Sequence, residues 1–135
     1  MIYFDTDILV HSLIIQDKSK HDVSVSQIAE AIFENKCYIS TLAIQETGFV
    51  LAKLGFNRDF IRHNILNLLY FATHFFAVNT FVRASDLAYE IGFKNINDCI
   101  HTALAEEYCD ELITYNKRDF QKIQKYTDLK ITILS

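Results

Sequence analysis

Short apolar segments alternate along the chain with longer stretches in which hydrophobic residues recur every three to four positions. The short segments are typical of buried strands, and the longer ones are typical of helices that pack on one face. The pattern predicts strands at residues 2–4, 37–40, 75–78, 112–114 and 130–133. It predicts helices at residues 8–15, 23–33, 41–54, 58–71, 80–91, 98–108 and 120–125. Strands that alternate with helices of about three turns favour an α/β fold with a mostly parallel sheet covered on both faces.

The composition does not divide the chain into parts. Its 135 residues include no proline and three glycines, so we expect no linker and no boundary between domains. Half of the residues are hydrophobic and 22% are charged, which is typical of a globular protein rather than a disordered one. The sequence therefore predicts a single domain, residues 1–135, that buries its own hydrophobic core.

Charge and cysteine content exclude some classes of protein. The net charge of −4 argues against a protein held on nucleic acid mainly by a basic surface, but not against an enzyme that meets nucleic acid through bound cations. The longest apolar stretch, residues 65–78, is too short for a membrane span. Cys37, Cys99 and Cys109 lack metal-binding spacing and are interpreted as free thiols. We expect a cytoplasmic protein that does not enter a membrane.

Acidic residues stand where predicted strands end or inside otherwise apolar helices. The carboxyl ends of parallel strands border the crevice in which α/β proteins bind ligands, and carboxylates there are costly unless a cation is bound. A divalent metal is therefore the first candidate ligand. Each acid alone also has a structural interpretation, as a helix cap or a solvent-facing side chain. The four acids are Asp5, Glu46, Asp98 and Asp119.

Four short motifs carry these acids: FDTD at residues 4–7, Glu46 in the helix after the second strand, NDCIHTALA at residues 97–105, and TYNKRDF at residues 114–120. Over essentially the whole chain, their order and spacing resemble the PIN-domain ribonucleases, particularly the VapC-type toxins of toxin–antitoxin pairs. The resemblance implies a three-layer α/β/α fold with a central, mostly parallel sheet of about four or five strands. It also implies Mg²⁺- or Mn²⁺-dependent endonucleolytic cleavage of RNA, a small antitoxin as partner, and a homodimer.

Under this interpretation the acids are the catalytic, metal-ligating residues. Asp5 and Asp98 are the central ligands, while Glu46 and Asp119 hold a second ion or orient its waters. Magnesium prefers oxygen ligands and keeps several of its waters, so one or two carboxylates for each ion suffice. The cation itself supplies the activated water and the charge stabilisation, so the chemistry requires no histidine base.

Residues next to the acids are expected to support them. PIN domains often have asparagine where Asp7 stands and aspartate where Asn116 stands, so either Asn116 or Asp119 could complete the site. The supporting residues are Thr6, Asp7, Thr114 and Asn116. Lys117 and Arg118 are candidate contacts for RNA phosphates. The five histidines lack metal-ligand spacing and are interpreted as surface or tolerated residues, with only His11 expected near the site.

Two other functions stay open at this point. The Asp5-Thr6-Asp7 sequence has the Asp-x-Asp form of haloacid-dehalogenase-like phosphatases, which would use Asp5 as a nucleophile. That family continues with Gly-Thr, whereas this chain continues with Ile8-Leu9. The third possibility is a non-catalytic binding module in which the acids are structural.

Overall fold

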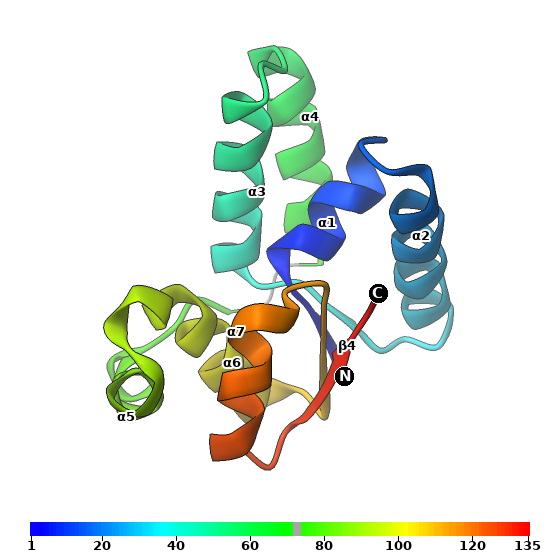
Figure 1. The fold of residues 1–135 in the computed structure, drawn as a ribbon. Coiled ribbons are helices and arrows are strands. Elements are labelled where there is room, and N and C mark those ends of the chain that lie inside the picture. The colour runs from blue at the N-terminus through cyan, green and yellow to red at the C-terminus, as the bar shows by residue number, and fades with distance from the viewer. Residues whose placement is uncertain (72–73) are drawn as a thin grey trace.

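The computed structural model describes residues 1–71 and 74–135, which fold into helices packed around one sheet (Figure 1). Within these ranges the sheet has four strands, all parallel to their neighbours, in the order β2-β1-β3-β4. The strands are β1 (Ile2–Phe4), β2 (Cys37–Tyr38), β3 (Glu111–Thr114) and β4 (Lys130–Ile133). The predicted α/β fold with a parallel sheet is confirmed.

Helices cover both faces of the sheet, because side chains along a strand point alternately to its two faces. Tyr3 and Leu112 pack against α5, α6 and α7, whereas Phe4 and Ile113 pack against the layer formed by α1 to α4 (Figure 1). The helices are α1 (Thr6–Leu13), α2 (Lys18–Phe33), α3 (Thr41–Lys53), α4 (Arg58–Leu69), α5 (Val78–Ile91), α6 (Ile96–Tyr108) and α7 (Lys117–Ile123). Two short 3₁₀ helices, η1 (Phe93–Asn95) and η2 (Gln124–Tyr126), precede α6 and follow α7.

Polar side chains set the starts of several helices by accepting hydrogen bonds from free backbone amides of the first turn. Ser40 accepts from the backbone nitrogen of Ala43 at 3.0 Å and so begins α3. Asp17 accepts from the backbone nitrogen of Lys20 at 3.1 Å, which starts α2 at Lys18, five residues before the predicted start at residue 23.

The predicted strand at residues 75–78 is wrong. Residues 74–77 have no regular structure, and α5 begins at Val78. The backbone nitrogen of Ala77 donates to Thr80 Oγ1 at 3.3 Å instead of to a strand. A short apolar run does not by itself distinguish a strand from the start of a helix. Residues 72 and 73, which belong to the apolar stretch 65–78, lie outside the described residues.

Two further expectations can be compared with the fold. In residues 1–71 and 74–135, no helix is both long enough and apolar enough to cross a membrane. Cys37, Cys99 and Cys109 are free thiols, and Cys99 is buried. The interpretation of the cysteines as unpaired is confirmed.

Candidate active site

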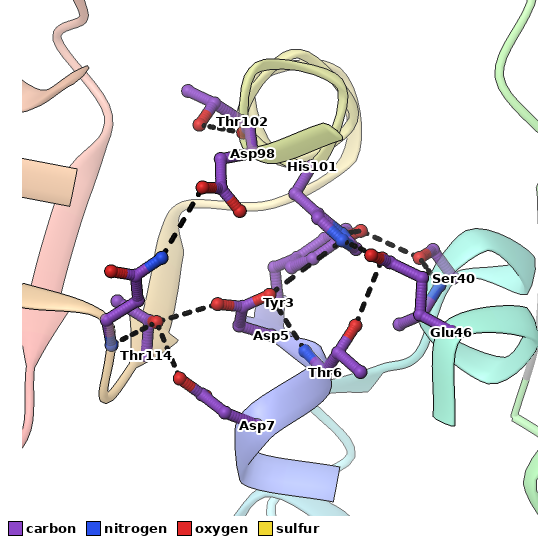
Figure 2. A network of polar contacts seen from close by, with 12 residues as sticks. Tyr3, Asp5, Thr6, Asp7, Ser40, Glu46, Asp98, His101, Thr102 and Thr114 are labelled. Carbon is purple, nitrogen blue, oxygen red and sulfur yellow. Dashed lines mark hydrogen bonds and ion pairs between the residues drawn. The ribbon is translucent and has the colours of Figure 1, made fainter. Parts of the chain in front are cut away.

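A cavity of about 330 Å³ lies at the edge of the sheet where β1 and β3 end. Its lining includes Asp5, Asp7, Glu46, Asp98 and Asn116. These side chains come from α1, α3, α6 and the segment after β3, and Figure 2 shows most of them converging. The parallel strands therefore bring residues from distant parts of the sequence to one edge.

Asp5 is the most buried of the cavity acids, with 5% of its surface exposed. It follows β1 and caps α1: one carboxylate oxygen accepts from the backbone nitrogen of Thr6 at 2.8 Å. The other oxygen accepts from Thr114 Oγ1, at the end of β3, at 2.7 Å. Because β1 and β3 are neighbours, the fold itself fixes both oxygens of this carboxylate.

Asp7 is the second residue of α1. The hydroxyl of Thr114 contacts the carboxylates of both Asp5 and Asp7. Oδ2 of Asp7 accepts from the backbone nitrogen of Tyr115 at 3.1 Å and from Thr114 Oγ1 at 3.3 Å. Its Oδ1 is buried and has no hydrogen-bond partner in the described chain. Burial, followed by the charge of Asp5, raises the pKa of Asp7 to about 7. Asp7 therefore brings to the cavity a carboxyl group whose charged form its surroundings disfavour.

Asn116 joins the two remaining aspartates. Its amide nitrogen lies 3.4 Å from Asp98 Oδ2 and 3.0 Å from Asp119 Oδ2. Its Oδ1 accepts from the backbone nitrogen of Asp119 at 3.2 Å and so caps α7. Burial, followed by the charge of Asp5, raises the pKa of Asp98 to about 7. The structure thus places Asn116 at the cavity and the buried Asp119 directly behind it.

Glu46, on α3, is held from two other elements. Its Oε1 accepts from Thr6 Oγ1 at 3.1 Å and forms a hydrogen bond with His101 Nε2 (Figure 2). His101 Nε2 also lies 3.8 Å from Asp5 Oδ1. Glu46 thus contacts the start of α1 and the middle of α6.

His101 is part of the site, so the expectation that only His11 among the histidines lies near it is wrong. His101 is 1% exposed, and its Nδ1 lies 2.5 Å from the hydroxyl of Tyr3. The available sequence signal was its spacing: it follows Asp98 by three residues, which places both on the same face of α6. His11 also lines the cavity, as expected.

The pKa values of His101 and Glu46 shift in the directions of an ion pair. Burial alone would lower the pKa of His101, but the hydrogen bond to Glu46 and the charges of nearby acids outweigh it, and the net shift is upward. Burial alone would raise the pKa of Glu46, but its hydrogen bond and charge interaction with His101 outweigh it, and the net shift is downward. Each partner therefore stabilises the charged form of the other.

Lys117 and Arg118 are exposed in the first turn of α7, beside the cavity. Arg118 Nε lies 3.4 Å from Asp119 Oδ1, while 86% of the arginine side chain is exposed. Both cations are therefore accessible to a bulky anionic ligand.

The donor set fits a hard divalent cation. Within the described residues, no three His, Cys, Asp or Glu side chains are arranged to hold a metal ion by themselves. Magnesium does not need such a cluster, because it binds through one or two carboxylates and keeps several waters. Asp5 and Asp98 supply carboxylates at the cavity, Asn116 supplies an amide, and Asp7 Oδ1 is an unpartnered acceptor.

The fold, together with the acids at the carboxyl ends of its strands, defines a known class of protein. The sequence matches the PIN domain over residues 2–126, and the chain therefore belongs to the PIN domain family. PIN domains are generally nucleases, which hydrolyse phosphodiester bonds. The resemblance predicted from the four motifs is confirmed.

Two solved structures share this fold. One is VapBC2 from Rickettsia felis bound to a DNA fragment from their promoter, with 19% identity, complete coverage of both chains and a TM-score of 0.70. The other is FitAcB from Neisseria gonorrhoeae, with 20% identity over 98% of this chain and 96% of that chain and a TM-score of 0.67. No curated protein matches the sequence. These two structures therefore have the same fold as this chain.

Proposed function

We propose that the protein is a divalent-metal-dependent endoribonuclease that hydrolyses RNA phosphodiester bonds in the cytoplasm, as the toxin of a type II toxin–antitoxin system. One observation carries the nuclease proposal. Asp5, Glu46 and Asp98, from three separate elements, line a single cavity at the ends of the parallel strands. Membership of the PIN domain family supports the same reaction class.

The chain's own residues have separate roles in this proposal. Asp5 and Asp98 would hold the cation, with Glu46 and Asp119 as outer carboxylates that orient its waters. Thr114 and the backbone nitrogen of Thr6 fix Asp5. When bound, Mg²⁺ or Mn²⁺ would lower the pKa of an attacking water and offset the charge on the phosphate oxygens.

RNA would approach the cavity past the start of α7. Lys117 and Arg118 are exposed there and would contact phosphates on either side of the cleaved bond. Asn116, which caps α7, keeps that turn next to Asp98. Binding would depend on the cation, because the carboxylates would otherwise repel the RNA backbone.

An antitoxin and a second copy of the chain are the proposed protein partners. The two similar solved structures are toxin–antitoxin assemblies, which supports a small antitoxin. An apolar groove of about 480 Å³ runs from the end of α1 to the turn between α3 and α4, and it could hold an antitoxin helix. Its lining includes Ile14, Ile15, Leu54, Phe56 and Phe60.

The phosphatase alternative has less support. Its nucleophile would be Asp5, yet the chain continues after Asp7 with Ile8-Leu9 and not with the Gly-Thr of that family. The family match favours the nuclease. A binding module with structural acids would explain neither the unpartnered oxygen of Asp7 nor the raised pKa of Asp98.

The experiment is RNA cleavage with total cellular RNA, in Mg²⁺ or Mn²⁺ and then in excess EDTA. We expect cleavage only with the cation. Replacing one electrostatic group of a catalytic site typically lowers the rate about 10²- to 10³-fold, and we expect that loss for Asp98→Asn. Asp128→Asn is the matched control, because Asp128 is an exposed acid at the opposite edge of the sheet. Cleavage that persists in EDTA, or in Asp98→Asn, would contradict the proposal.

A further inference from the structure

A closed chain of hydrogen bonds starts and ends on α3 beside the cavity (Figure 2). Ser40, the cap of α3, lies 2.7 Å from the hydroxyl of Tyr3 on β1. That hydroxyl lies 2.5 Å from His101 Nδ1 on α6. His101 Nε2 then bonds to Glu46, which lies on α3 six residues after Ser40. Three elements that are distant in sequence are thus tied together through one tyrosine and one histidine.

The middle of this chain has little freedom to move. Tyr3 is fully buried and His101 is 1% exposed. The Tyr3 ring stacks on Tyr38 at a centroid distance of 5.6 Å and meets the His101 ring edge-on, also at 5.6 Å. Because both ring nitrogens of His101 have partners, the imidazole is held in one orientation.

In the hydrogen bond between His101 and Glu46, Nε2 of the histidine is the donor. A carboxylate only accepts, so Nε2 carries the proton, while Nδ1 faces a hydroxyl that can either donate or accept. The same Nε2 lies 3.8 Å from Asp5 Oδ1. His101 therefore presents one N–H between two carboxylates of the cavity.

We propose that His101, oriented by Tyr3, is a positioning residue that fixes the carboxylate of Glu46 for cation binding. The inference rests on the proposed cation site, and it assigns a function to Tyr3, which lies outside the acidic motifs, and to His101, a non-acidic residue of the motif at 97–105. Thr6 and His101 both bond to Oε1 of Glu46, and His101 is the one of the two whose ring is held rigidly from a second side. Residues that orient metal-binding side chains typically change metal affinity 10- to 100-fold when they are lost.

The test is Mn²⁺ affinity without RNA, measured from the electron paramagnetic resonance signal of free Mn²⁺. His101→Gln and His101→Asn form a matched pair, because the glutamine amide reaches the place of Nε2 and the asparagine amide only that of Nδ1. We expect His101→Asn to bind Mn²⁺ at least about 10-fold more weakly than wild type, and His101→Gln to restore most of the affinity. Wild-type affinity in both variants, or equal weakening in both, would overturn the proposal, as would a wild-type protein that binds no Mn²⁺.

Tyr3→Phe gives a second measurement that does not depend on how the histidine variants fold. It keeps the buried ring and removes only the hydroxyl between Ser40 and His101. We expect weaker Mn²⁺ binding with cooperative thermal unfolding retained, and unchanged affinity would count against the positioning function. If the variants bind Mn²⁺ more weakly but the wild-type protein cleaves no RNA, only the nuclease proposal is refuted. Cleavage by wild type with unchanged Mn²⁺ affinity in all three variants would refute the positioning function alone.

Discussion

The acidic side chains at the two edges of the sheet differ in their surroundings. At the edge where the strands begin, Glu106 and Glu111 have basic partners. Arg83 binds Glu106 through two nitrogens, at 2.9 and 3.0 Å, and Lys130 lies 3.0 Å from Glu111. The hydrogen bond to Glu106 is the main cause of the raised pKa of Arg83.

At the edge where the strands end, acids outnumber the cations beside them. The cavity is lined by Asp5, Asp7, Glu46 and Asp98. His101 is a basic residue buried beside these acids. Burial and the charge of Asp5 raise the pKa of Asp7 and of Asp98 to about 7. The contrast teaches that Glu106 and Glu111 are compensated by cations of the chain, whereas Asp7 and Asp98 are half-buried and form no ion pair within the described residues. Asp7 and Asp98 therefore mark the place where an outside cation is expected.

The largest expected effect that separates the two edges is stabilisation by a cation. Mn²⁺ at 100 times its dissociation constant should raise the free energy of unfolding by about 2.7 kcal/mol, since it binds only the folded site. Thermal unfolding with and without Mn²⁺ measures this shift. Asp98→Asn should lose it, while Asp128→Asn at the paired edge should keep it. An equal shift in both variants would place the cation elsewhere.

The next effect is the pH dependence of stability without metal. The pKa of Asp98 is about 7 in the folded protein and near its ordinary value when unfolded, so the folded state binds more protons and its stability falls as pH rises toward 7. Between pH 5.5 and 8, this amounts to about 2 kcal/mol for one acid. His101 acts with the same sign: the stability it contributes through its raised pKa is lost as pH rises through that pKa.

Urea unfolding at pH 5.5 and pH 8 in EDTA measures this dependence. Asp98→Asn should make it less steep by the share of one acid, because Asp7 and His101 still contribute with the same sign. The variant should be as stable as wild type or more so at pH 8, because a charge that its surroundings disfavour has been removed. A pH dependence as steep in Asp98→Asn as in wild type would mean that other groups cause it.

The smallest expected effect lies at the paired edge. Arg83→Met removes the partner of Glu106 and a hydrogen bond to the backbone oxygen of Tyr126. Since the arginine is partly exposed, we expect a loss of about 1 kcal/mol in the free energy of unfolding. RNA cleavage and Mn²⁺ affinity should not change. A loss of either in the folded variant would show that the two edges are not independent.

Much of the fold followed from local pattern. The first and last strands have the predicted bounds, because each is a short apolar run next to a polar turn. The predicted strand at residues 75–78 is wrong, since strand formation depends on a neighbouring strand and not on hydrophobicity alone. The early start of α2 depends on a cap by Asp17, a weak signal beside the apolar stripe.

The sequence predicted those residues of the site that the ends of the parallel strands position. Asp5, Glu46 and Asp98 stand at the cavity because parallel strands and the helices after them end or begin at one edge. The sequence left Asn116 and Asp119 as alternatives, and the structure links the two through one amide. His101 escaped notice because its importance depends on Tyr3 and Glu46, which are 98 and 55 residues away.

The buried tyrosine beside His101 also makes the protein its own optical reporter. The chain contains no tryptophan, so its near-ultraviolet absorption and circular dichroism come chiefly from seven tyrosines. Tyr3 belongs to a stack with Tyr38 and Tyr108, whose fixed rings give dichroic bands that a mobile surface tyrosine would not. We expect occupation of the cavity to change this dichroism, which needs no label, through the phenol that hydrogen-bonds to His101.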